Sequence, residues 1–209
     1  MDIKLTRADI VITASAHNPS ILEPRWLKEN GLIDEDPENF IHTPEFSLFD
    51  SASFFLSVDR QRLQITAKEV KVDLLERLAN IGTRYVDLLP HIPFQALGLN
   101  FVWNAELGKG ESLPQIIVSI GPVGDLSNIL TDHIIQYGSI IYARKNPYLL
   151  RLRIEPQGES ILAYNFNYHY EIKGIDSRDI KTFIESLTKL YEHSKTVVES
   201  ISQVRGGRR

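Results

Sequence analysis

The sequence predicts an α+β domain: a mostly antiparallel sheet of about six to eight strands, helices on one face and a long C-terminal amphipathic helix. Three observations predict this class. Residues 160 to 172 and residues 148 to 155 both alternate apolar and polar side chains, and the apolar residues after Asp176 recur at spacings of three and four. Alternation is typical of strands with one packed face, and the longer spacing is typical of a helix.

The N-terminal half is expected to hold a strand, a long connection, a hairpin and a helix. The predicted elements are a strand at 8 to 15, hairpin strands at 53 to 59 and 62 to 67, and a helix at 70 to 81. Gly82 is expected to end that helix. The connection from 18 to 44 is rich in proline and should form a turn or two of helix near Trp26. Its length suggests a contact surface or a cover for a sheet edge.

The C-terminal half is expected to be mostly strands. They are predicted at 94 to 104, 115 to 120, 133 to 144, 148 to 155 and 160 to 172, with a short helix from Asp125 to Thr131. The first of these strands has small residues around Gly98 on one side, which predicts that something bulky packs there. Gly158 is expected to close the last hairpin in a left-handed conformation, with Leu152 opposite Leu162.

A single helix is predicted from 177 to 203, capped by Asp176 or Ser177. A helix of this length needs a flat apolar surface to cover. The aromatic side of residues 160 to 172 is the best candidate for that surface. Tyr164, Phe166 and Tyr168 are therefore predicted to lie in the core, which argues against their use as stacking platforms for single-stranded nucleic acid.

Length and composition indicate one domain over residues 1 to 204 and a basic flexible tail at 205 to 209. Strands precede a helix in each half, so a two-half repeat with its break near 107 to 114 is an open alternative. The chain has no cysteine, which excludes disulfides, thiolate metal sites and cysteine nucleophiles. It shows no secretory signal and no membrane span, so we expect a cytoplasmic protein without a membrane partner. A formal charge of −4 disfavours nucleic acid as a partner.

No motif in the sequence carries a recognisable chemistry. The glycine-rich segments lack the spacing of a phosphate loop, and there is no GxSxG nucleophile elbow. His17 and His42 flank acidic residues at 34 to 38, which is compatible with a metal site but is more typical of a solvated acidic loop. We therefore expect no metal and no cofactor.

One set of polar residues is a candidate ligand site. Asn165, Asn167 and His169 share the polar side of their strand, and Arg151 and Arg153 face the same side from the predicted partner strand. In a concave pocket the arginines would clamp an anionic group, and His169 would transfer protons if the protein is an enzyme. The alternative is that this side of the sheet simply meets solvent.

Two functions follow as hypotheses. The first is a non-enzymatic binding or assembly protein that acts through protein–protein contacts, with a protein partner or as a homo-oligomer. It is favoured because no nucleophile, phosphate or metal signature is present. The second is an enzyme or small-ligand binder that uses the polar sheet face around His169, with Arg151 and Arg153 as the anion clamp.

Overall fold

The computed structural model describes residues 2–106, 108 and 138–203. The helices and strands are β1 (Asp2–Ala14), η1 (Pro19–Ile21), α1 (Pro24–Glu29), β2 (Asn39–His42), β3 (Phe46–Asp50), β4 (Phe54–Asp59), β5 (Arg62–Ala67), α2 (Val72–Leu88), β6 (Phe94–Glu106), β7 (Ser139–Lys145), β8 (Tyr148–Gln157), β9 (Ile161–Glu171), α3 (Ser177–Glu185) and α4 (Leu187–Gln203). The predicted strand at 115 to 120 and the predicted helix at Asp125 to Thr131 lie outside the described residues.

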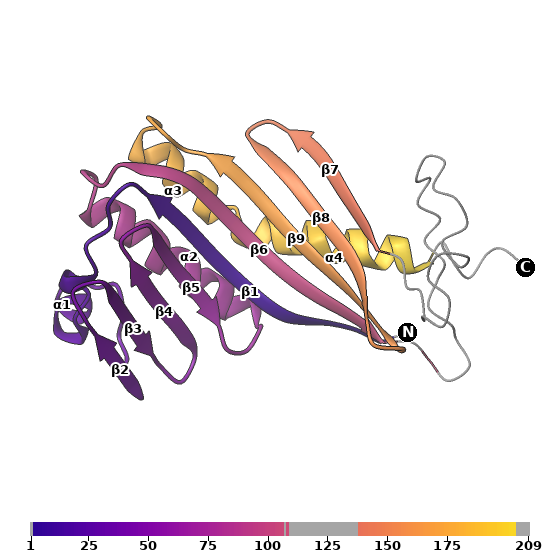
Figure 1. The fold of residues 1–209 in the computed structure, drawn as a ribbon, viewed down its shortest axis with the longest axis horizontal. Coiled ribbons are helices and arrows are strands. Elements are labelled where there is room, and N and C mark those ends of the chain that lie inside the picture. The colour runs from indigo at the N-terminus through magenta and orange to yellow at the C-terminus, as the bar shows by residue number, and fades with distance from the viewer. Residues whose placement is uncertain (1, 107, 109–137, 204–209) are drawn as a thin grey trace, which may run out of the picture.

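The described strands form one antiparallel sheet in the order β2-β3-β4-β5-β1-β6-β9-β8-β7. Helices α2, α3 and α4 lie on one face of this sheet (Figure 1). The fold is therefore α+β, as the sequence predicts. The nine strands exceed the predicted six to eight because β2 and β3 were not foreseen; β2 falls inside the proline-rich connection and β3 directly follows it.

Both halves of the chain wind through the sheet in the same way. Each half begins with a long strand, β1 or β6, and these two strands pair at the middle of the sheet. Each half then places its last strand, β5 or β9, beside its first one, with the intermediate strands further out. The long-range pairing of β1 with β6 joins the two halves. The two halves of the sheet divide between α2 and β6, and a sequence repeat with its break near 107 to 114 stays a prediction.

The aromatic side of β9 is buried beneath the C-terminal helices. Tyr164 and Tyr168 are 0% exposed and Phe166 is 2% exposed. The phenol of Tyr168 contacts Nδ1 of His193 on α4 at 2.7 Å. The predicted core is confirmed, so these aromatic rings cannot stack on a nucleic acid.

The helices differ from the prediction at two points. The helix predicted to end at Gly82 continues as α2 to Leu88. A Cβ at Gly82 would lie 3.3 Å from Cγ2 of Ile184, so this glycine lets α2 and α3 approach closely rather than ending a helix. The single helix predicted from 177 to 203 is two helices, α3 and α4, which meet at Ser186. There the backbone N–H bonds to Phe183 and Ile184 instead of continuing the α-helical pattern.

The hairpin of β8 and β9 forms as predicted, but its register is different. Leu152 pairs with Phe166, not with Leu162. The loop consists of residues 158 to 160, and its first residue, Gly158, has the predicted left-handed conformation, with a φ of +71°. Because the register differs by an even number of residues, the apolar sides of the two strands still coincide.

Candidate functional site

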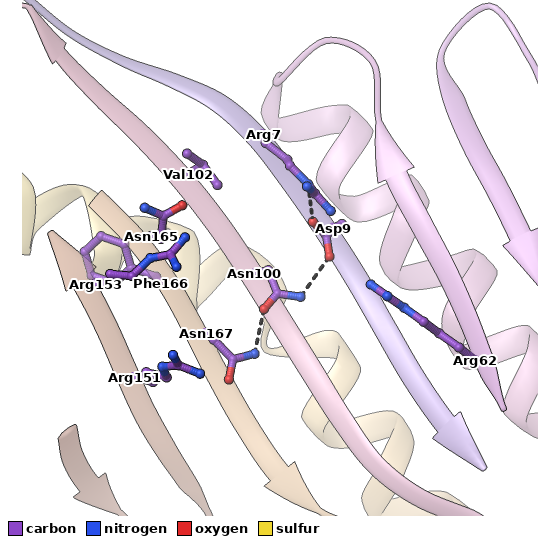
Figure 2. A pocket seen from close by; sticks show the side chains of 10 residues that line it. All are labelled: Arg7, Asp9, Arg62, Asn100, Val102, Arg151, Arg153, Asn165, Phe166 and Asn167. Atoms are coloured by element: carbon purple, nitrogen blue, oxygen red, sulfur yellow. Dashed lines mark hydrogen bonds and ion pairs between the residues drawn. The ribbon is translucent and has the colours of Figure 1, made fainter. Parts of the chain in front are cut away.

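The face of the sheet opposite the helices carries a row of polar side chains across four central strands. Asp9 on β1 pairs with Asn100 on β6, which pairs with Asn167 on β9, which in turn pairs with Arg151 on β8. Asn100 Nδ2 donates to Asp9 Oδ1 at 2.8 Å, and Asn167 Nδ2 donates to Asn100 Oδ1 at 2.6 Å (Figure 2). Residues from both halves of the chain therefore meet in one hydrogen-bonded row.

Asp9 determines which side-chain atoms donate and which accept in this row of hydrogen bonds. Its side chain is only 2% exposed, and its Oδ2 accepts a hydrogen bond from Arg7 Nε at 2.7 Å. An ionised carboxylate can only accept hydrogen bonds, so Asn100 must turn its amide nitrogen towards Asp9 and its oxygen towards Asn167. Asn167 must then donate with its nitrogen. The arrangement leaves the Asn167 oxygen as an acceptor available to a ligand.

A hollow of about 330 Å³ lies over this row. It is lined by Arg7, Asp9, Arg62, Asn100, Val102, Arg151, Arg153, Asn165, Phe166 and Asn167 (Figure 2). Four arginines and one carboxylate line it, whereas the whole chain has a formal charge of −4. The hollow is thus a cationic surface on an acidic protein, and its size is within the range of small-ligand sites.

The four arginines are not equivalent. Arg7 pairs with Asp9, and Arg153 Nε lies 3.1 Å from Glu155 Oε2. Within the described part of the chain, the exposed guanidinium groups of Arg62 and Arg151 form no ion pair or hydrogen bond. These two groups therefore retain their full capacity to hold a carboxylate or phosphate.

Gly98 makes room for one member of the polar row. It lies on β6 two residues before Asn100, and a Cβ at this position would be 3.1 Å from Asn167 Nδ2. The nearest group beside this glycine is the small amide of Asn167, and the bulky group that the sequence predicts there stays a prediction. A side chain at position 98 would displace that amide from Asn100.

The structure brings together four of the five residues proposed from sequence. Arg151, Arg153, Asn165 and Asn167 all line the hollow. His169 does not; its Nε2 donates to Glu171 Oε1 at 2.9 Å on the exposed sheet surface. That any of the five binds a ligand stays a prediction.

Sequence reasoning missed six of the lining residues. These are Arg7, Asp9 and Arg62 from the first half, and Asn100, Val102 and Phe166 from the second. One signal was present: Asp9 lies between Ala8 and Ile10, on the polar side of an alternating strand. That signal could not show which strand would lie beside β1.

His17 has a structural environment in the core. It is 4% exposed, with Nε2 3.2 Å from the carbonyl of Ile12 and Nδ1 2.8 Å from the hydroxyl of Tyr85. Since the carbonyl can only accept, Nε2 carries the proton and Nδ1 accepts from Tyr85. Burial lowers the pKa of His17, which favours this neutral form.

The acidic residues of the loop from 34 to 38 are engaged in ion pairs. Asp34 and Glu35 lie beside Arg77, and Asp36 and Glu38 pair with lysines. Among the residues that the structure describes, no three His, Asp or Glu side chains are grouped closely enough to hold a metal ion. The loop from 34 to 38 therefore has a structural explanation for its charge.

No protein-family model matches this sequence, and no curated protein matches it at a significant level. The described residues form an α+β protein with one antiparallel sheet, which has helices on one face and a cationic hollow on the other. No helix in residues 2–106, 108 and 138–203 is long and apolar enough to cross a membrane.

Proposed function

We propose that this protein is a binding protein that holds an anionic ligand in the hollow on the open face of its sheet. The observation that carries the proposal is that Arg62 and Arg151 line one hollow and leave their guanidinium groups unpaired within the described chain. An arginine fork matches the geometry of a carboxylate or phosphate and makes two parallel hydrogen bonds to it. The oriented row of Asp9, Asn100 and Asn167 forms a pre-organised floor for such a ligand.

A binding role suits the described lining better than a catalytic one. The lining residues include no serine, threonine, histidine or lysine, and the one carboxylate, Asp9, is buried and bonded to Arg7 and Asn100. Nucleophilic and acid–base catalysis both need a group that can reach the substrate and change its protonation or bonding. The proposal therefore assigns no reaction to this site.

Calorimetric titration with inorganic pyrophosphate and with citrate tests the proposal. We expect the wild-type protein to bind at least one of these anions, and Arg151→Gln to weaken that binding at least tenfold. Arg178→Gln is the matched control, because Arg178 lies on α3, on the other side of the sheet, and loses the same charge. Absence of binding by the wild type, or equal affinities for the two variants, would overturn the proposal.

A second candidate function is contact with a protein partner or a second copy of the chain. It is favoured by β7, the edge strand of the described sheet, where Ile140, Ile141 and Tyr142 are 51%, 44% and 63% exposed. An exposed edge strand with apolar side chains can pair with another strand. Light scattering after size exclusion checks this: a self-associating wild type should become monomeric when Tyr142 is replaced by lysine. A strict monomer at high concentration would exclude self-association.

A further inference from the structure

The two unpaired arginines of the hollow come from opposite halves of the protein. Arg62 is the first residue of β5, and Arg151 lies in β8. Strands β1, β6 and β9 lie between them in the sheet. With neighbouring strands about 4.8 Å apart, four spacings separate the two backbones by about 19 Å across the sheet.

Both side chains nevertheless line the same hollow. Figure 2 shows Arg62 and Arg151 at its two sides, with Asp9, Asn100 and Asn167 between them. A single phosphate or carboxylate that binds one of these arginines leaves the other without a partner. Two anionic groups, one at each side, would satisfy both.

The floor between the arginines offers polar groups without net charge. The carboxylate of Asp9 is neutralised by Arg7 and bonded to Asn100, so it gives no room for an anion at the centre. Asn167 leaves an amide oxygen free to accept, and the buried Nδ2 of Asn165 has no partner within the described residues. The centre of the hollow therefore suits hydroxyl groups better than charged ones.

Resting on the proposed function, we infer that the hollow is built for a bis-anionic ligand with a polar, uncharged middle. Arg62 holds one anionic group and Arg151 holds the other, and the asparagine row contacts the middle. Bisphosphorylated polyols and long dicarboxylates with hydroxyl groups belong to this class. The ligand then also bridges the two halves of the sheet, which the pairing of β1 with β6 joins.

The experiment compares fructose 1,6-bisphosphate with fructose 6-phosphate as probes, in calorimetric titrations of the whole protein. We expect the bisphosphate to bind at least tenfold more tightly than the monophosphate to the wild type. Arg62→Gln and Arg151→Gln should each remove most of this preference, and the double variant should bind neither probe measurably. Arg178→Gln should behave as the wild type, and thermal melts should show that all variants fold.

The outcomes separate this inference from the proposed function. Equal affinities of the two probes for the wild type, with weaker binding by Arg151→Gln alone, would overturn the bis-anionic inference and keep a single-anion site. A preference for the bisphosphate that survives Arg62→Gln would also overturn it, because the second group would then bind elsewhere. Failure of both these probes and of pyrophosphate and citrate would overturn the proposed function itself.

Discussion

The two faces of the sheet are built from the same strands but meet different demands. On β6, Phe101 and Trp103 face the helices and are 0% and 3% exposed, whereas Asn100 and Val102, which alternate with them, face the hollow. Since side chains alternate along a strand, one sequence can supply an apolar core and a polar surface at successive positions. The covered face sets the stability of the fold, and the open face is free to hold charge.

The hydrogen bonding of polar side-chain atoms also differs between the two faces. On the covered face, Trp103 Nε1 donates to Ser194 Oγ at 2.9 Å, and the hydroxyl groups of Tyr168 and Tyr170 bond to residues of the C-terminal segment. The hydroxyl of Tyr164 is an exception, since it is buried with no partner in the described chain. On the open face, Arg62, Arg151 and the Nδ2 of Asn165 line one hollow without a partner in the described chain. The ligand proposed for the open face would complete the hydrogen bonding there.

Replacement of a large core side chain should produce the largest effect. Phe101→Ala removes a fully buried ring beneath α4 and is expected to lower the free energy of unfolding by about 3 to 5 kcal/mol. Val102→Ala, one residue further on the open face, is the matched control and should cost much less. Urea denaturation followed by circular dichroism measures both. Equal losses would show that the two faces do not divide their roles in this way.

Removal of the carboxylate at the end of the polar row should have the next largest effect. Asp9→Ala leaves Asn100 and Arg7 without their acceptor, and we expect it to lower the free energy of unfolding by about 1 to 3 kcal/mol. The row also loses the group that orients its hydrogen bonds. Glu171→Ala is the control, since that carboxylate is 82% exposed and its contact with His169 should contribute little. A stability loss no larger than that of the control would contradict the role of Asp9.

The covered face could be predicted from sequence because its signals are local. The alternation in β9 identified Tyr164 and Tyr168 as core, and the helical spacing after Asp176 identified what covers them. The predictions for this face were wrong where a contact between distant residues, and not the local sequence, determines the structure. Gly82 has the residue type of a helix end, but the contact with Ile184 is what requires it.

The open-face site could be predicted only in its C-terminal half. Arg151 and Asn167 belong to one hairpin, so alternation alone places them on one side. Asp9 and Asn100 come together through the pairing of β1 with β6, strands that are far apart in the sequence. Alternation assigns a residue to a face but does not say which distant strand lies beside it. The half of the site that depends on sheet order was therefore missed.

The pH dependence of stability should reflect His17 in the core. Burial lowers the pKa of His17 in the folded protein, so the unfolded chain binds a proton more readily once the pH falls below about 6.5. The contribution of neutral His17 to the free energy of unfolding is therefore complete above this pH, and it decreases as the pH falls towards the pKa of His17 in the folded protein. The pKa of His193 is also lowered, by burial and by Lys145, and adds a change of the same sign.

Urea midpoints measured between pH 8 and pH 5 test this expectation. The wild type should lose stability on acidification, and His17→Gln should show a smaller loss over the same range, although it is less stable at pH 8 because Tyr85 and Ile12 lose their partner. An unchanged pH dependence in this variant would mean that His17 does not resist protonation.

The smallest change to the protein, one methyl group at Gly98, tests whether the position of the asparagine row matters for binding. Gly98→Ala places a Cβ 3.1 Å from Asn167 Nδ2 and should displace that amide from Asn100 without removing any polar group. We expect anion affinity to fall severalfold, while the free energy of unfolding changes by no more than about 1 kcal/mol, since alanine is tolerated in strands at least as well as glycine. The matched control is the same substitution in an Asn167→Ala background, where the methyl group has no amide to displace and should no longer affect binding. If Gly98→Ala weakens binding equally in both backgrounds, its effect comes from the strand itself, and the row of Asp9, Asn100 and Asn167 is not what positions the ligand.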